Sequence, residues 1–414
     1  MNDYKYSNIV ILSILLLVSL LVVFSPTLSL YFIVSFLILF SLKNNSYYGV
    51  VILLLILWLF FNAINTIAFQ NFIYSSDDFS SYYNNYLSFL YSDDFLKNLT
   101  EFGYFEVGLP FLNFLLTLII QEPEPYKVKF YYSILQGIGV IYCAMRAAKY
   151  YNLNVNSTIL LITLTIVFYK SILAIQLSRQ TFSSIFIILY IFSTNKKSKF
   201  IFLLSSVIFH SSAIFLLPIS IFLFKKRTKK DFLIFALIAT FIYTIIQFSY
   251  LLLQSSLINY PIINKLDFSI RLLRDDEKVK QSIDTSILLM AYIVPILFLS
   301  FISKNHSHFK YNYLIIIFGL FLFQSFPGLN NRVFFLQLYF FLGFYYFSTF
   351  FIFGKSNHLV YKIFILIIFN FLFLQTHLIR DENIKRFPEY SNTPFYYLNN
   401  ISEKNQSVDR TLLR

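Results

Sequence analysis

Long apolar stretches separated by short polar gaps recur along the chain from residue 9 to residue 377. A helix needs about 20 predominantly apolar residues to cross roughly 30 Å of membrane hydrocarbon. The pattern therefore predicts an all-α polytopic integral membrane protein with about 11 transmembrane helices. The expected spans are residues 8–23, 28–42, 48–64, 130–146, 155–175, 180–194, 231–254, 284–303, 311–325, 332–353 and 359–378.

The spans follow one another closely enough to predict a single polytopic membrane domain over residues 1–378. No small-x-small cleavage site follows the first apolar run, so we expect that run to be retained as a span. Residues 65–101 and 255–283 are expected to be outer loops, and residues 379–414 a polar C-terminal tail.

The composition supports a membrane protein and limits the classes of function that the chain could have. The chain is 57% hydrophobic and 13% charged, with a mean hydropathy of +0.67, whereas soluble domains are about 25% charged. A net charge of +13 would suggest nucleic acid in a soluble protein, but here its distribution along the loops carries the information. The single cysteine, Cys143, excludes an internal disulfide.

Basic residues gather in alternate loops, and positive charge in short loops is retained on the cytoplasmic side. Only Asp3 and Asp231 are acids near these groups, so we place all of the groups inside. They are Lys5, Lys43, Arg146 with Lys149, the trio Lys196, Lys197 and Lys199, the 225–230 run, Lys304 with Lys310, and Lys355 with Lys362.

This alternation constrains two further apolar stretches. Residues 102–120 are expected to form a helix lying at the outer face, because residues 102–146 can cross only once in total. Residues 200–224 begin and end inside but are too short to cross twice, so we expect a re-entrant helical hairpin that breaks at His210. The alternative is one continuous span with the 225–230 run outside.

Ionisable groups near membrane depth are the candidates for chemistry, because signatures of soluble enzymes are absent and such groups are costly to bury. Arg179, followed by Gln180, lies at an outer end, where a guanidinium could hold phosphate or merely reach lipid headgroups. Arg332 lies at a second outer boundary and could instead pair with a loop acid. His210 could be a general base or a structural hydrogen-bonding residue.

Carboxylates and aromatic rings gather in the segment from Asp77 to Tyr83. Two adjacent acids without a third ligand make a weak metal site, so we expect no metal and no cofactor. Asp78 and Tyr82 would suit sugar hydroxyls and ring faces, although a solvated loop would have the same composition.

Several segments, in this order, resemble the EpsG family of exopolysaccharide membrane proteins, which belongs with the Wzy-type O-antigen polymerases. The Arg-Gln pair and the Phe-His segment are the most specific of them. The segments are Asp78-Phe79-Ser80-Ser81-Tyr82-Tyr83, Glu106-x-Gly108 leading into Leu112-Asn113-Phe114-Leu115, Arg179-Gln180, and Ile208-Phe209-His210-Ser211-Ser212-Ala213-Ile214 ending at Pro218.

The resemblance implies a membrane glycosyltransferase that polymerises undecaprenyl-pyrophosphate-linked repeat units into O-antigen, capsule or exopolysaccharide. Its place would be the outer face of the bacterial inner (cytoplasmic) membrane, as a multi-pass protein. Partners implied are the lipid-linked glycans, membrane lipids, a chain-length regulator and other polysaccharide export proteins, without nucleic acid. The implied site has Arg179 and Arg332 on pyrophosphate, His210 as base or acceptor-orienting residue, Asp78 and Tyr82 on sugar, Gln180 supporting Arg179, and Glu106 among the substrate-binding residues.

Three other classes remain open at this point. A membrane acyltransferase of surface glycans would need its catalytic His or Arg toward the cytoplasm, whereas His210 is expected to face outward. A flippase or transporter of the lipid-linked unit would show two similar halves, and no such symmetry is visible. A structural or assembly subunit of the export machinery is the third.

Overall fold

All regular secondary structure in the described part of the chain is helical, without a strand, which confirms the predicted all-α class. Two of its segments, Tyr48–Ile67 and Pro125–Tyr150, are long and apolar enough to cross a membrane. The number of spans stays a prediction, and residues 359–378 lie outside the described part. The computed structural model describes residues 2–24, 26–42, 48–69, 78–92, 94–121, 124–254, 276–302, 309–324 and 341–349.

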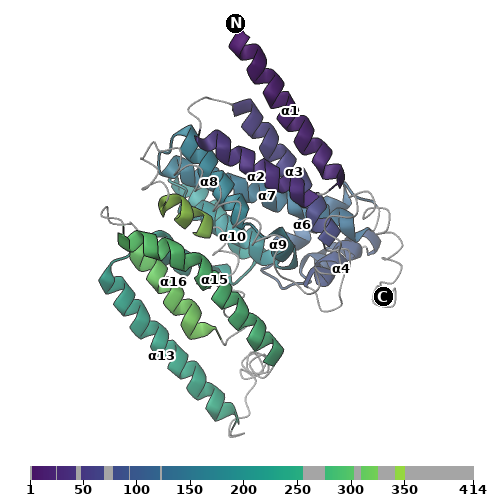
Figure 1. The fold of residues 1–414 in the computed structure, drawn as a ribbon. Helices are drawn as coiled ribbons and strands as arrows, with labels where there is room; N and C mark the ends of the chain where they lie inside the picture. The colour runs from purple at the N-terminus through teal and green to yellow at the C-terminus, as the bar shows by residue number, and fades with distance from the viewer. Residues whose placement is uncertain are drawn as a thin grey trace. The chain divides into compact units, whose positions relative to one another are not determined.

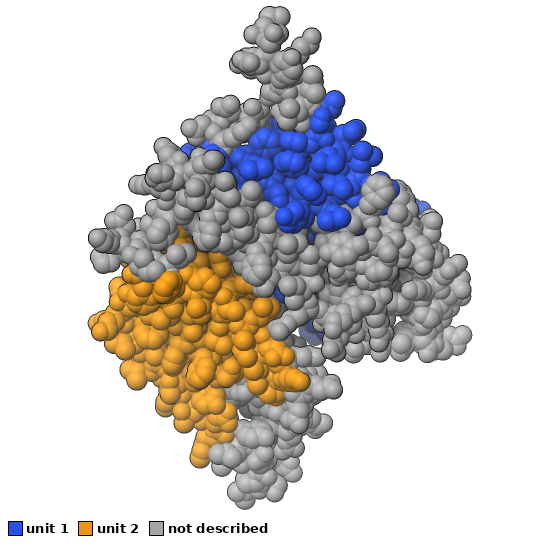
Figure 2. All heavy atoms as spheres, in the orientation of Figure 1, with its two compact units in different colours: residues 1–217, 357–414 blue, residues 218–356 orange. Residues whose placement is uncertain are grey.

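The chain divides into two compact units, which Figure 2 shows in blue and orange. Unit 1 contains residues 1–217 and 357–414, and unit 2 contains residues 218–356. All the residues of the candidate site that the structure describes belong to unit 1.

Unit 1 is a helical assembly in which α2 packs on α3 and α8, while α7 packs on α3, α8 and α10 (Figure 1). Apolar side chains such as Leu37, Trp58 and Leu164 fill its interior. Its helices are α1 (Asn2–Phe24), α2 (Pro26–Leu42), α3 (Tyr48–Phe69), α4 (Asp78–Tyr91), α5 (Phe95–Leu99), α6 (Gly108–Thr117), α7 (Pro125–Tyr150), α8 (Val155–Phe168), α9 (Ser171–Gln176), α10 (Ser178–Ile191), α11 (Lys196–Phe209) and the start of α12 (Ala213–Phe224).

The segment 65–101, which hydropathy predicted to be an outer loop, contains α4 and α5, and its side of the membrane stays a prediction. The buried positions of α4 recur at intervals of three and four residues, which is the period of a helix with one buried face. Because most of these buried positions are tyrosine, a search for long aliphatic runs does not detect the helix. The buried side chains with that spacing are Phe79, Tyr82, Tyr83, Tyr86 and Leu87.

Helix α6, within the predicted 102–120 helix, is joined to its neighbours by a buried polar network. Asn85 of α4 donates to the Asn98 carbonyl at 2.8 Å and to Glu101 Oε2 at 2.6 Å. Asn113 of α6 donates to Asn85 Oδ1 at 2.9 Å, and the Tyr132 hydroxyl of α7 donates to Asn113 Oδ1. The network therefore fixes α4, α5, α6 and α7 around the turn that leads into α6.

The structure differs from the prediction in one span and one loop. The 155–175 span is divided, because Tyr169 and Lys170 leave the helical conformation between α8 and α9. No glycine or proline announces this break, so hydropathy could not show it. The 255–283 loop is shorter than expected because α15 already begins at Asp276, while residues 255–275 lie outside the described part.

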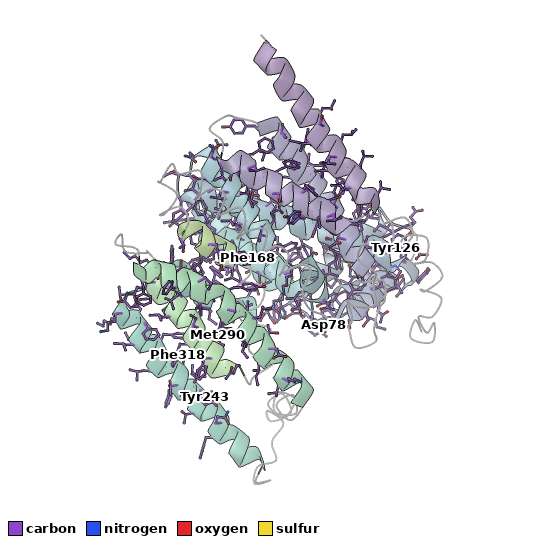
Figure 3. The ribbon with its side chains drawn as sticks, in the orientation of Figure 1. Asp78, Tyr126, Phe168, Tyr243, Met290 and Phe318 are labelled. Atoms are coloured by element: carbon purple, nitrogen blue, oxygen red, sulfur yellow. The ribbon has the colours of Figure 1, made fainter. Side chains whose placement is uncertain are left out.

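Unit 2 contains α13 (Lys229–Gln254), α15 (Asp276–Ile302), α16 (Lys310–Phe323) and the helical residues 341–349. Helix α16 packs on both α13 and α15. Tyr243 of α13 and Phe318 of α16, both labelled in Figure 3, pack against the buried pair Ala239 and Phe323. Asn312 donates to the Leu223 carbonyl at 2.6 Å, which satisfies a carbonyl at the end of α12.

The buried network predicts that two adjacent asparagines of α4 differ in importance. Asn85→Ala should lower stability by about 1–3 kcal/mol, because it removes one of the two acceptors of the Asn113 amide and the donor to the buried Asn98 carbonyl. Asn84→Ala is the matched control, since Asn84 is exposed and should cost less than about 0.5 kcal/mol.

The single buried thiol of Cys143 provides the measurement. A thiol-reactive fluorophore should label the purified protein only as it unfolds, so the labelling midpoint on heating reports stability. Equal midpoints for the two variants would show that the network does not hold α4 in place.

Candidate functional site

The predicted break of the 200–224 segment at His210 is present in the structure. Helix α11 ends because His210 adopts an extended conformation, with φ −158° and ψ 121°. The chain turns through Ser211 and Ser212, and α12 begins at Ala213. The turn frees the Ser211 backbone N–H from helical bonding, so that it can donate to another group.

A tight turn ahead of α6 brings Glu106 to this break. The N–H of Glu106 donates to the Gly103 carbonyl at 3.1 Å, and the N–H of Gly103 donates to the Thr100 carbonyl at 2.9 Å. Gly103 has φ +121°, a conformation that side-chain-bearing residues rarely adopt. The exposed residues Tyr104 and Phe105 form the outside of the turn, and the Glu106 side chain is buried.

The Glu106 carboxylate joins two segments that are distant in sequence. Its Oε1 accepts hydrogen bonds from the Ser211 backbone N–H at 2.9 Å and the Ser211 hydroxyl at 2.5 Å, and lies 3.0 Å from His210 Nδ1. Its Oε2 accepts from Arg179 Nη1 at 2.7 Å. One carboxylate therefore connects the start of α10 to the break between α11 and α12.

Close packing of α6 against α11 makes this connection possible. A Cβ at Gly108 would lie 2.9 Å from the Phe209 ring and 3.1 Å from the Ile208 carbonyl oxygen. Only a residue without a side chain allows the first turn of α6 to approach the end of α11 so closely. The spacing Glu106-x-Gly108 thus has a structural reason, because Gly108 sets the depth at which Glu106 reaches His210.

Arg179 lies in the first turn of α10, just after the chain leaves the helical conformation at Leu177. Its guanidinium carbon is 4.7 Å from the Phe102 ring centroid and 5.6 Å from that of Tyr82. The side chain is 25% exposed, and its buried Nε has no hydrogen-bond partner among the described residues. Arg179 is therefore held by Glu106 through one nitrogen and keeps further donors available.

Glu106 is a fixed anion rather than a proton carrier. Burial by itself would raise the pKa of this carboxyl, but the hydrogen bonds from His210 and Ser211 outweigh burial and lower the pKa to about 2. An ionised carboxylate can only accept hydrogen bonds, so His210 must carry a proton on Nδ1 where the two meet. In a neutral imidazole this leaves Nε2 as the basic atom.

Only some of the other predicted site residues lie beside Arg179 and Glu106. Gln180 is buried beside Arg179, and Tyr82 is buried with its ring toward the guanidinium. Asp78, labelled in Figure 3, opens α4, is exposed, and contacts neither Glu106 nor Arg179. Arg332 lies outside the described residues.

Sequence reasoning did not identify Ser211 and Phe102 as parts of the site. Ser211 follows His210 directly, so its place at a predicted helix break was the available signal. Phe102 gave no signal beyond its proximity to Glu106 in sequence. Within the described ranges, no group of three His, Cys, Asp or Glu residues could hold a metal ion.

Comparison with known proteins gives one match. Residues 67–392 match the EpsG family, so the match includes every residue of the site described above. No curated protein gives a significant match. No solved structure does so either.

The close approach at Gly108 predicts a strong effect of one methyl group. Gly108→Ala should lower stability by about 1–3 kcal/mol, because the added Cβ would overlap the Phe209 ring and push the start of α6 away from α11. Thermal unfolding of the purified protein, followed through Cys143 labelling, measures the change.

Gly49→Ala provides the control, since a Cβ at Gly49 would meet nothing within 4 Å. That variant should unfold at the wild-type temperature or slightly above it. A wild-type unfolding temperature for Gly108→Ala would contradict the close-packing explanation.

Proposed function

Because the chain belongs to the EpsG family, a family of Wzy-like polysaccharide polymerases, we propose that it polymerises lipid-linked oligosaccharide repeat units. Family membership makes it a polysaccharide polymerase-like membrane protein. In our proposal the donor is a growing glycan on undecaprenyl pyrophosphate, and the acceptor is the sugar of another lipid-linked unit. The reaction takes place at the outer face of the bacterial inner membrane, in a multi-pass protein.

The convergence of Arg179 and His210 on Glu106 is the observation that supports this proposal most strongly. Transfer from a pyrophosphate carrier needs a cation where negative charge grows on the leaving group, and a base near the acceptor hydroxyl. The chain supplies both, Arg179 from the first turn of α10 and His210 from the break after α11, and one carboxylate holds them together. Hydropathy alone would have left the two residues unrelated.

Arg179 is suited to the pyrophosphate. Nη1 is bonded to Glu106, whereas Nε and Nη2 have no hydrogen-bond partner within the described residues. These two nitrogens form one edge of the guanidinium, which matches two oxygens of a phosphate. A buried N–H without a partner costs about 1–3 kcal/mol, and a phosphate oxygen at this edge would recover that energy. The Phe102 and Tyr82 rings hold the guanidinium plane in place.

His210 is suited to the acceptor. Its side chain is 20% exposed, and its Nε2 has no partner among the described residues. In the proposed step Nε2 takes the acceptor hydroxyl proton while the acceptor oxygen forms a bond to the anomeric carbon of the donor. The bond from that carbon to the pyrophosphate oxygen breaks, and undecaprenyl pyrophosphate leaves with the bonding electrons. His210 then gives up its proton to the leaving pyrophosphate or to water, which restores the neutral base.

The remaining assignments belong to the same proposal. Asp78 and Tyr82 lie one helical turn apart on α4, so that sugar could lie along this helix toward Arg179. Gln180 supports Arg179, and Arg332 is a second cation for the pyrophosphate. The donor already holds an activated bond, so the reaction needs neither a nucleotide sugar nor ATP. A chain-length regulator and other export proteins are the proposed partners.

Substitution of Arg179 tests the role of the guanidinium. Arg179→Lys keeps the charge but loses the fork, so it should reduce polymer formation at least about tenfold, and Arg179→Gln should nearly abolish it. The variants are expressed in a strain that lacks the chromosomal gene, and the length distribution of the surface polysaccharide is read on a gel at matched protein levels.

Arg146→Gln is the control, because Arg146 belongs to α7 and, among the described residues, makes only a long hydrogen bond of 3.5 Å to Ser193. It should leave the polymer ladder unchanged. Wild-type chain lengths in Arg179→Gln would exclude Arg179 from the mechanism. A gene-deletion strain that makes full-length polymer lacking only its acetyl groups would instead support an acyltransferase.

A further inference from the structure

We infer that Glu106 is a positioning residue that fixes the His210 imidazole for proton transfer and holds Arg179 beside it. The inference rests on the proposed function, and it changes the expected role of Glu106 from contact with substrate to control of two residues that contact substrate. In this role Glu106 acts through His210 and Arg179 and does not itself touch the reacting atoms.

The geometry around the carboxylate supports this role. Every oxygen of Glu106 is already occupied by protein donors: Oε1 by Ser211 and His210, and Oε2 by Arg179. The side chain is only 10% exposed. A carboxylate with these partners has little capacity left for a sugar hydroxyl, and its negative charge would repel a pyrophosphate. Its contacts therefore favour a role in positioning other side chains.

The contact with His210 fixes one tautomer. Because the carboxylate accepts, Nδ1 carries the proton and Nε2 points its lone pair away from Glu106. When Nε2 takes a second proton, the imidazolium is stabilised by the anion 3.0 Å from Nδ1. The charged groups that the described residues bring to this imidazole are Glu106 and, across the carboxylate, Arg179.

The two Ser211 donors give the arrangement its rigidity. Ser211 binds the same oxygen as His210, through both its backbone and its hydroxyl, so the helix break cannot turn without releasing Glu106. An amide in place of the carboxylate could not satisfy both sides. Glutamine has one acceptor and one donor group, so its NH₂ would face a donor either at Arg179 or at Ser211 and His210.

Glu106→Gln and Glu101→Gln form a matched pair for the test. Both residues belong to the segment ahead of α6, but Glu101 accepts from Asn85 and touches neither Arg179 nor His210. The rate of polymerisation by purified protein, with lipid-linked repeat units in detergent or vesicles, is measured against pH. Glu106→Gln should lower the rate at least about tenfold. Its acidic limb should move to lower pH, because the neutral amide no longer stabilises the imidazolium.

Glu101→Gln should keep the wild-type rate and profile. A Glu106→Gln variant with the wild-type rate would overturn the inference. A lower rate with an unmoved acidic limb would also overturn it, because that result describes a residue needed for folding alone.

A second measurement does not depend on activity. Nitrogen-15 NMR of histidine-labelled wild-type protein, with His210 assigned from the signal lost in His210→Asn, should show neutral His210 protonated on Nδ1. Protonation on Nε2 instead would overturn the inference. A wild-type protein that polymerises nothing would refute the proposed function, and the NMR result would still decide whether Glu106 sets the tautomer.

Discussion

The arrangement of unit 1 around the site depends on one buried negative charge. Removing a carboxylate from water is expensive unless opposite charge and hydrogen-bond donors replace the lost solvation. Glu106 obtains these from Arg179 and from the neighbouring pair His210 and Ser211. Arg179 is 73 residues from Glu106 in sequence, and His210 is 104 residues away. The requirement to satisfy this charge joins α6, α10 and the break between α11 and α12 into one local structure.

The surrounding fold makes that arrangement possible in two ways. Gly103 and Gly108 let the turn and the first residues of α6 adopt a shape and a closeness that other residues would prevent. The network of Asn85, Asn113 and Tyr132 then fixes α6 against α4 and α7. The position of Glu106 is therefore set by packing and polar contacts on both sides of the turn.

Hydropathy and charge predicted much of the architecture. The apolar runs correspond to α2, α3, α7 and α13, and the length of the 200–224 segment with its flanking lysines predicted the break at His210. These features are local, so the sequence carries them directly. The break at Tyr169 was missed because no glycine or proline marks it, whereas the break at Leu177 falls in the predicted gap between residues 175 and 180. Helix α4 was missed because its buried face consists largely of tyrosine. The family resemblance, rather than the hydropathy pattern, pointed to Glu106, and neither could show that Glu106 meets Arg179 and His210. The ion pair of Arg179 with Glu106 depends on tertiary packing.

A double-mutant cycle between Glu106 and Arg179 tests the central claim most directly. The unfolding free energies of wild type, Glu106→Gln, Arg179→Gln and the double variant are compared in the same detergent. The ion pair predicts that the double variant is more stable than the sum of the single effects implies, by at least about 0.5 kcal/mol, because each single change leaves the other charge unpaired. Single effects that add to within about 0.3 kcal/mol would contradict a site held together by this carboxylate.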